Sequence, residues 1–432
     1  GQREQVETLQ RSVERAAPPT RQEDIAWTTE HDAATPAGLE RGELVRAVLA
    51  RNPTLEAARQ AWQSVIHQQR QATTLADPTV SYELAPASIR SNNVRYGQVI
   101  RVEQHFPWPS TLGLAGDAVL ADAEAMGADY HAVKLDLALA ASVLFDELVK
   151  VDRLIALNVE HRRLTEDIKA AALSQYQAGR APQQEPLQAE VELSHVLHEA
   201  VLLEADRAVV VARINQLLHR LPEASLPPPR REEVNAPDLG DSMTLQEQAI
   251  ESRPELAAGR ARVTARESDA ELTQREFFPE LGIMGEYNSM WREAEHRWML
   301  GVSLNLPVQV RARRGALDSA EADARRARAN LEGLTDEVRS QVDQRRRRVL
   351  EAHHVLTLYQ DRLLPAAEAQ IQAARAGYEA GRNSFQALID AERSLRKLEI
   401  EYEQARASLG QRTAELARAL GDFAAAGSGG AP

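Results

Sequence analysis

Hydrophobic and polar side chains alternate in four short segments of the chain, which predicts four β-strands. Between residues 298 and 306 every second residue is large and hydrophobic: Trp298, Leu300, Val302, Leu304 and Leu306. Similar alternations occupy residues 79–84, 97–106 and 281–287. A period of two is typical of a strand with one hydrophobic face. Because a hairpin standing alone between long helices is marginally stable in water, we expect these strands to find partners in other chains.

Helical periodicity covers most of the remaining chain. From about Gly113 to Tyr176, roughly 64 residues or ~95 Å of helix at 1.5 Å per residue, there is no proline. Within it, hydrophobic residues recur at coiled-coil spacing: Leu137, Ala141, Leu144, Leu148, Val151 and Ile155. A matching segment runs from about Gly315 to Tyr378, and we expect Pro365 to kink its last turns.

Short motifs recur in the same order in the two halves of the chain. Tyr176-Gln-Ala-Gly-Arg180 returns as Tyr378-Glu-Ala-Gly-Arg382, and Asn52-Pro-Thr-Leu55 returns as Arg253-Pro-Glu-Leu256. Asp77-Pro78 and Pro107 likewise return as Phe278-Pro279 and Pro307. The repeated unit is therefore a helix, two strands, a very long helix, a sharp turn and a returning helix. We predict a mostly α fold with a small β part, and a symmetric assembly rather than an enzyme with a pocket.

The repeats and the prolines between them predict five regions. Residues 1–40, punctuated by prolines, are expected to form an extended N-terminal arm. Residues 41–220 and 242–421 are the two structural repeats, joined by a proline-rich linker at 221–241. Residues 422–432 have the small-residue composition of a disordered tail.

Composition and charge narrow the function. The chain has 432 residues, a formal net charge of −13 and no cysteine, which excludes disulfides and thiolate chemistry and argues against nucleic-acid binding. We find no phosphate-binding glycine loop, no Ser/His/Asp arrangement and no paired carboxylates in an apolar pocket. The sequence therefore predicts neither an enzyme nor a cofactor. No stretch is apolar enough for a transmembrane helix, although membrane-crossing strands are compatible with the pattern.

These paired motifs, with Phe106-Pro-Trp-Pro109 after the second strand, resemble the TolC-type outer-membrane efflux ducts, most closely their cation (heavy-metal) efflux subgroup. The resemblance covers residues 40 to 420. It implies a homotrimer in which each chain gives four strands to a twelve-stranded transmembrane β-barrel and its long helices to a coiled-coil α-barrel in the periplasm. The implied function is a passive exit channel for metal cations or small toxic compounds. Its implied partners are a periplasmic adaptor, an inner-membrane pump and outer-membrane lipid.

The resemblance also assigns roles to particular residues. The two turns are the periplasmic tips that contact the adaptor: Tyr176, Gly179, Arg180, Pro182, Tyr378, Gly381 and Arg382. Gly179 and Gly381 are in addition expected to end their helices in the left-handed conformation. Asp390 is placed at the tunnel entrance, but the first of the family's two entrance aspartates, three residues earlier, is replaced by Ala387. The hydrophobic face that includes Trp298, Leu300, Val302 and Leu304 is expected to meet lipid.

Other interpretations of the sequence remain open. A periplasmic adaptor also contains a long helical hairpin, but normally one, beside a lipoyl-like domain that we do not find. A coiled-coil scaffold explains the helices but not the duplicated strands. His195 and His198 with Glu192 could bind a divalent cation, and Arg345–Arg348 could bind an anion, but solvated surface is the commoner origin of both patterns. The chain begins at Gly1, so we expect any targeting segment or lipid-bearing cysteine to precede it.

Overall fold

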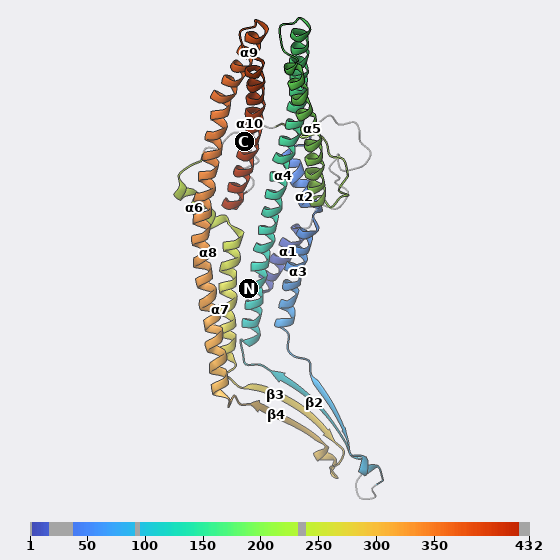
Figure 1. Ribbon diagram of the computed structural model, residues 1–432. Coiled ribbons are helices and arrows are strands. Elements are labelled where there is room, and N and C mark those ends of the chain that lie inside the picture. Colours follow the sequence, from blue (N-terminus) through green and yellow to red (C-terminus); the bar gives the residue numbers. More distant parts are fainter. Residues whose placement is uncertain (1, 17–37, 91–95, 232–238, 423–432) are drawn as a thin grey trace. The chain divides into compact units, whose positions relative to one another are not determined.

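The structure is a computed structural model that describes residues 2–16, 38–90, 96–231 and 239–422 (Figure 1). Elements follow the same order in both repeats, in a mostly helical chain with one antiparallel sheet, as predicted. After α1 (Gln2–Arg15), the first repeat contains α2 (Arg41–Arg51), α3 (Pro53–Ala72), β1 (Thr79–Leu84), β2 (Gln98–Phe106), α4 (Thr111–Gln177) and α5 (Gln184–Leu217). The second contains α6 (Ser242–Ser252), α7 (Pro254–Arg275), β3 (Glu280–Asn288), β4 (Trp298–Asn305), α8 (Val310–Leu358), α9 (Leu364–Glu379) and α10 (Phe385–Leu420).

The prolines shared by the two repeats set matching helix boundaries. Asn52 and Arg253, which precede Pro53 and Pro254, both have extended backbone, with φ/ψ of −69°/121° and −68°/123°. A residue before proline is excluded sterically from the helical region, so the helix ends there and the proline starts the next one. The duplicated motifs at residues 52–55 and 253–256 are therefore helix boundaries.

The chain forms two compact units that cut across the repeats. One comprises residues 1–17, 57–130 and 254–335 and contains the sheet; we call it the sheet unit. The other comprises residues 18–56, 131–253 and 336–432 and contains both turns; we call it the turn unit. Each unit thus takes equivalent segments from both halves of the chain.

In the sheet unit, the four strands form one antiparallel sheet in the order β1-β2-β3-β4 (Figure 1). The two predicted pairs are joined because β2 pairs with β3 from Val99–Asn288 to Phe106–Leu281. We expected the partners of both strand pairs to come from other chains, but one partner comes from the other repeat of the same chain. Among the described strands, β1 and β4 have one neighbour each and form the edges.

The N-terminal segment differs from the extended arm that we predicted. Residues 2–15 form helix α1, which buries Val6 and Val13. Gln2 donates hydrogen bonds to the carbonyl oxygen of Gly113 (2.8 Å) and to Asp117 (2.6 Å), so the helix is fastened to the start of α4. The rest of the predicted arm up to residue 37 lies outside the described residues, as do residues 232–238 of the linker and 423–432 of the tail.

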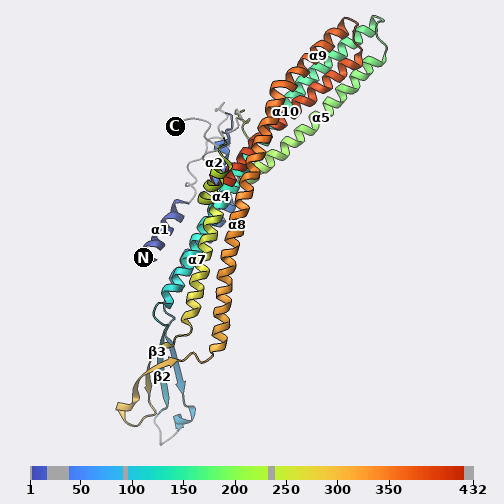
Figure 2. The same ribbon diagram turned by 90° about the vertical axis from the view of Figure 1, so that its left-hand side faces the viewer.

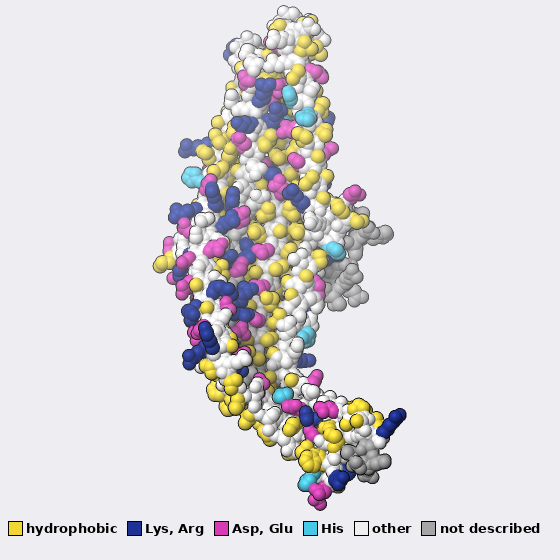
Figure 3. Space-filling view, turned by 60° about the horizontal axis from the view of Figure 1, so that its bottom comes forward, with side chains coloured by type: hydrophobic (Ala, Val, Ile, Leu, Met, Phe, Trp, Pro, Cys, Tyr) yellow, Lys and Arg dark blue, Asp and Glu magenta, His cyan; other side chains and the backbone are white. Residues whose placement is uncertain are grey.

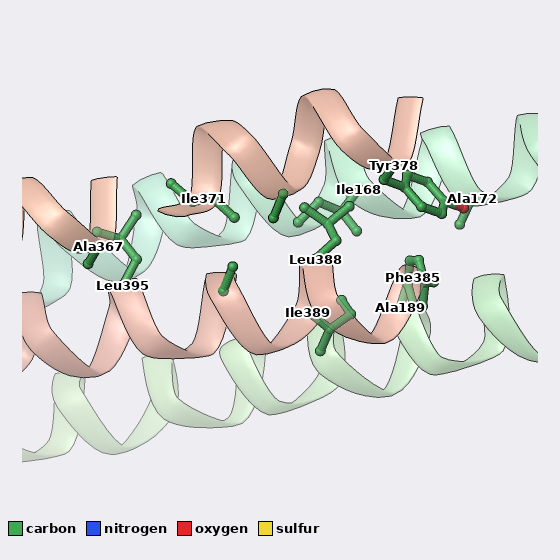
Figure 4. Packing of buried hydrophobic residues seen from close by; sticks show 12 residues of the cluster. Ile168, Ala172, Ala189, Ala367, Ile371, Tyr378, Phe385, Leu388, Ile389 and Leu395 are labelled. Carbon is green, nitrogen blue, oxygen red and sulfur yellow. The ribbon is translucent and has the colours of Figure 1, made fainter. Parts of the chain in front are cut away.

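In the turn unit, α4, α5, α9 and α10 run side by side (Figure 2). Their shared core contains Ile168 and Ala172 of α4, Ala189 of α5, and Tyr378, Phe385 and Leu388 from the second turn and its flanking helices (Figure 4). A second core lies around Phe145 and Leu148 of α4 and Ile214 of α5. The small alanine side chains of these cores let the helices approach closely.

The two long helices are built differently. The first, α4, is continuous for 67 residues. The second is interrupted at Tyr359–Leu363 by a π-helical segment between α8 and α9, directly before Pro365. The helix type therefore changes just before Pro365, where we expected a kink. Among the described helices, none is both long and apolar enough to span a membrane.

Candidate functional site: the paired turns and the amphipathic sheet

The two turns have the same backbone. Gly179 and Gly381 have φ of 69° and 68°, the left-handed region that glycine adopts without strain. In the first turn, Gly179 N–H donates to the Tyr176 carbonyl (2.9 Å) and Arg180 N–H to the Gln175 carbonyl (2.9 Å). The second turn repeats both bonds, from Gly381 to Tyr378 (2.9 Å) and from Arg382 to Gly377 (2.8 Å). Both α4 and α9 therefore end in the hydrogen-bond pattern of a Schellman motif, and the predicted left-handed stops are confirmed.

The tyrosines of the two turns have different surroundings. Tyr176 is 40 % exposed, whereas Tyr378 is 7 % exposed and packs edge-on against Phe385, with ring centroids 5.6 Å apart. The Tyr378 hydroxyl donates a 2.7 Å hydrogen bond to Glu185 of α5. Burial and this bond to a carboxylate both raise the pKa of Tyr378. Tyr378 therefore joins the second turn to the start of the first returning helix.

The remaining residues assigned to the turns are exposed. These are Gly179, Arg180, Pro182, Gly381 and Arg382. Within the described part of the chain, Arg180 and Arg382 form no ion pair, so their guanidinium groups are open to solvent. Each turn thus presents an exposed arginine on a backbone held by the same hydrogen bonds. Of the assigned residues, only Tyr378 is buried.

Asp390 lies on the exposed side of α10, with its side chain 58 % exposed. It accepts a 2.9 Å hydrogen bond from Gln386, one helical turn earlier, and lies 3.9 Å from the guanidinium of Arg393. Arg393 also donates a 3.1 Å bond from Nε to Glu192 of α5, whose carboxylate is buried. Asp390 is therefore accessible, but a cation on the same helix offsets part of its charge.

Buried charges that the sequence analysis missed join α4 to α10. His161 of α4 lies between Glu392 and Glu399, with its Nδ1 3.3 Å from Glu392 and its Nε2 2.5 Å from Glu399. Burial alone lowers the pKa of His161, but its interactions with the carboxylates of Glu392 and Glu399 outweigh burial and raise the pKa to about 9. His161 is thus a cation at neutral pH. Its partners are 231 and more residues away in sequence, so no local spacing indicated them.

The register of the sheet separates a polar face from a hydrophobic one. Ser81, Arg101 and Glu286 are paired across β1, β2 and β3, and Arg101 donates a 2.8 Å bond to Glu286. His105 lies 3.4 Å from Glu103 on the same face. In the space-filling view, acidic, basic and histidine side chains accompany hydrophobic ones over the sheet (Figure 3).

The opposite face is hydrophobic and open. Val80, Val102, Gly285 and Leu300 are in register across all four strands. On β4, Trp298 is 74 %, Leu300 84 %, Val302 67 % and Leu304 59 % exposed. In water, such a contiguous apolar surface is costly and marks an interaction surface. The alternation predicted from the sequence is confirmed, and within the described residues this face has no covering element.

The other candidate sites have simpler explanations. Within the described ranges, no group of three or more His, Asp or Glu side chains could hold a metal ion. Glu192, which the sequence placed near His195 and His198, is buried and bound to Arg393. Three of the four arginines at 345–348 pair with Glu415, Asp343 and Glu351, and Arg346 donates to the Gly240 carbonyl. The arginine run is therefore a surface network of ion pairs.

Comparison with known proteins agrees with this geometry. Residues 245–422, which are most of the second repeat, match the family model described as outer membrane efflux protein. No curated protein matches the sequence.

Solved channel structures match over nearly the whole chain. The outer-membrane channel OprN has 18 % identity and a TM-score of 0.74, with 88 % of this chain and 89 % of that one covered. CusC has 18 % identity and a TM-score of 0.76, with 88 % and 92 % covered. The open state of the Neisseria gonorrhoeae MtrE outer-membrane channel has 17 % identity and a TM-score of 0.72, with 88 % and 89 % covered. At these identities the likeness establishes the fold.

The family match and the fold point to the same conclusion. They support neither the adaptor nor the scaffold interpretation, and the family is not one of enzymes. The second repeat of the chain thus matches the outer membrane efflux protein family, and the chain as a whole has the fold of solved outer-membrane efflux channels.

Proposed function

We propose that three copies of the chain assemble into a passive duct from the periplasm to the cell exterior. Each copy contributes its four-stranded sheet to one closed barrel, with the hydrophobic face toward lipid and the Arg101–Glu286 face toward a wet lumen. A bilayer offers no hydrogen bonds to an open strand edge. The edge strand β4 of one copy therefore pairs with β1 of the next, which closes the barrel and leaves no unpaired edge.

The exposed hydrophobic face of the sheet is the observation that carries this proposal. A second support for the trimer lies on α5, where hydrophobic side chains more than half exposed recur at helical spacing: Leu187, Val191, Leu202 and Val209. A neighbouring copy packed on this stripe covers it.

We assign the two turns to contact with a periplasmic adaptor, which links the duct to an inner-membrane pump. Their backbones are rigid because the left-handed glycines and paired hydrogen bonds fix them, and Arg180 and Arg382 are available for acidic groups of a partner. Asp390 is the proposed entrance group. Arg393 offsets part of the Asp390 charge, which weakens the preference of the entrance for cations. The finer assignment to heavy-metal efflux therefore rests on the sequence resemblance.

Two substitutions on neighbouring positions of β4 test the proposal. Val302→Arg places a charge on the hydrophobic face and is expected to cost about 2–4 kcal/mol at the membrane midplane, with loss of folded trimer from the outer membrane. Ser303→Arg points to the polar face and is expected to assemble as the wild type does. The amount of heat-resistant trimer in membranes measures both. Equal assembly of the two variants would contradict the assignment of the faces.

A further inference from the structure

The hydrophobic alternation of β4 continues beyond the end of the strand and stops at a group of arginines. Leu306, Val308 and Val310 occupy the next alternate positions and are exposed, Val308 by 82 %. Arg311, Arg313 and Arg314 come immediately after them, and residues 306–317 contain no acidic residue. An apolar surface therefore changes to a cationic one within a few residues, where β4 passes into α8.

A fourth arginine, Arg275 at the end of α7, lies near this cluster because α7 and α8 are joined here. Arg313 donates a 2.7 Å hydrogen bond to the carbonyl oxygen of Glu276, which joins the start of α8 to the end of α7. Arg275, the last residue of α7, holds its guanidinium 5.9 Å from the centroid of the Phe278 ring. Its Nε is buried and has no hydrogen-bond partner. Arg311 and Arg314 are exposed and form no ion pair within the described part of the chain.

Aromatic side chains lie beside the arginines. Phe278 stacks on Trp108, with ring centroids 5.0 Å apart and an angle of 19° between the planes, and both are 38 % exposed. Half-exposed aromatic rings next to cations are typical of the level at which a membrane protein meets lipid headgroups. Two carboxylates, Glu276 and Glu280, are also exposed here. Four arginines outnumber them, which leaves a local excess of positive charge.

The equivalent junction in the first repeat lacks this feature. Residues 107–116, which lead from β2 into α4, contain no charged residue. The duplicated backbone therefore does not require arginines at this place. Because the arginines occur in the second repeat and not in the first, we infer that they do more than join a strand to a helix.

We propose that Arg275, Arg311 and Arg314 bind the phosphate headgroups of anionic phospholipids at the periplasmic surface of the outer membrane. The proposal rests on the lipid-facing assignment of β4 made above. A lipid fits better than a soluble anion because the arginines directly follow the exposed hydrophobic face. One lipid molecule can place its headgroup on the arginines and its acyl chains on that face. Arg313 has a structural role, since its bond to Glu276 holds α7 and α8 together.

The test measures binding of dioleoylphosphatidylglycerol to the purified full-length chain in detergent, followed by tryptophan fluorescence. Wild type is expected to bind saturably, and more weakly at high salt because the contacts are ionic. Arg311→Gln/Arg314→Gln is expected to bind about 30-fold more weakly, at ~1 kcal/mol for each arginine near a membrane surface. The matched control, Arg325→Gln/Arg326→Gln, removes two exposed arginines farther along α8 and is expected to bind as wild type.

Other outcomes separate the sources of error. Unchanged affinity in Arg311→Gln/Arg314→Gln, or equal weakening in the control pair, would overturn the headgroup site. Displacement of the lipid by millimolar inorganic phosphate would show a soluble-anion site instead. If Val302→Arg still prevents membrane assembly while the arginine variants bind lipid normally, only the headgroup site is wrong. If Val302→Arg assembles normally, the lipid-facing assignment itself has failed.

Discussion

The two turns share a backbone and differ in what their side chains do. Gly179 and Gly381 have the same φ within one degree and the same two capping hydrogen bonds. Tyr378, however, is buried against Phe385 and bound to Glu185, while Tyr176 lies open to solvent. Duplication has preserved the geometry that glycine makes possible. The two tyrosines differ because Tyr378 packs against Phe385 and bonds to the first returning helix through Glu185.

The largest expected effect separates the two tyrosines. Tyr378→Ala removes a buried ring and its hydrogen bond and should destabilise the turn unit by about 3–5 kcal/mol. Tyr176→Ala removes an exposed ring and should cost less than about 1 kcal/mol. Chemical unfolding of the purified protein in detergent, followed by circular dichroism, measures both. Similar losses would mean that the turns are also equivalent in packing.

The glycines should respond alike, because their backbones are alike. Valine at either position is forced into the left-handed region and should cost about 1–2 kcal/mol. No atom lies within 4 Å of a Cβ added at either glycine, so backbone strain alone sets the cost. Thermal unfolding of Gly179→Val and Gly381→Val should therefore give equal shifts. The Gly→Asn variants serve as controls, since asparagine tolerates this region, and should shift less.

The smallest effect concerns charge. Asp390 of the second returning helix corresponds to Gln188 of the first. Gln188 carries no charge and donates a hydrogen bond to Gln386. Asp390→Asn removes the charge at this position, as in the first helix, and should reduce cation selectivity in planar bilayers by less than about twofold, because Arg393 already offsets the carboxylate. Ala387→Asp should raise it. A large loss of selectivity in Asp390→Asn would show that Arg393 does not compensate Asp390.

Features with a local cause could be predicted from the sequence. The four strands were expected from alternation with a period of two, and the ends of α4 and α9 from Gly179 and Gly381. The exposed hydrophobic face of β4 was also predictable, since Trp298, Leu300 and Val302 are two residues apart. Helix α1 was missed although Val6, Leu9 and Val13 have helical spacing, because the prolines that suggested an extended arm all lie beyond its end.

Features that depend on distant pairing could not be predicted. Joining β2 to β3 brings together strands about 180 residues apart, and no turn or spacing records that choice. The ion pairs of His161 with Glu392 and Glu399 likewise require α4 and α10 to be already side by side. The adaptor contacts of the turns and the lipid contacts of β4 remain predictions, because each involves a molecule other than this chain.

The π-helical segment at Tyr359–Leu363 has a mechanical consequence. Gly381 lies two residues farther from Pro307 than Gly179 lies from Pro107, and every residue added to an α-helix rotates the rest of that helix by about 100°. A wider turn absorbs part of such an insertion, and Pro365 removes one further hydrogen-bond donor. The continuous α4 transmits bending and torque along its length, as a solid rod does. We expect the α8–α9 pair to bend first at residues 359–365, because the π-helical segment and Pro365 weaken the hydrogen-bond ladder there.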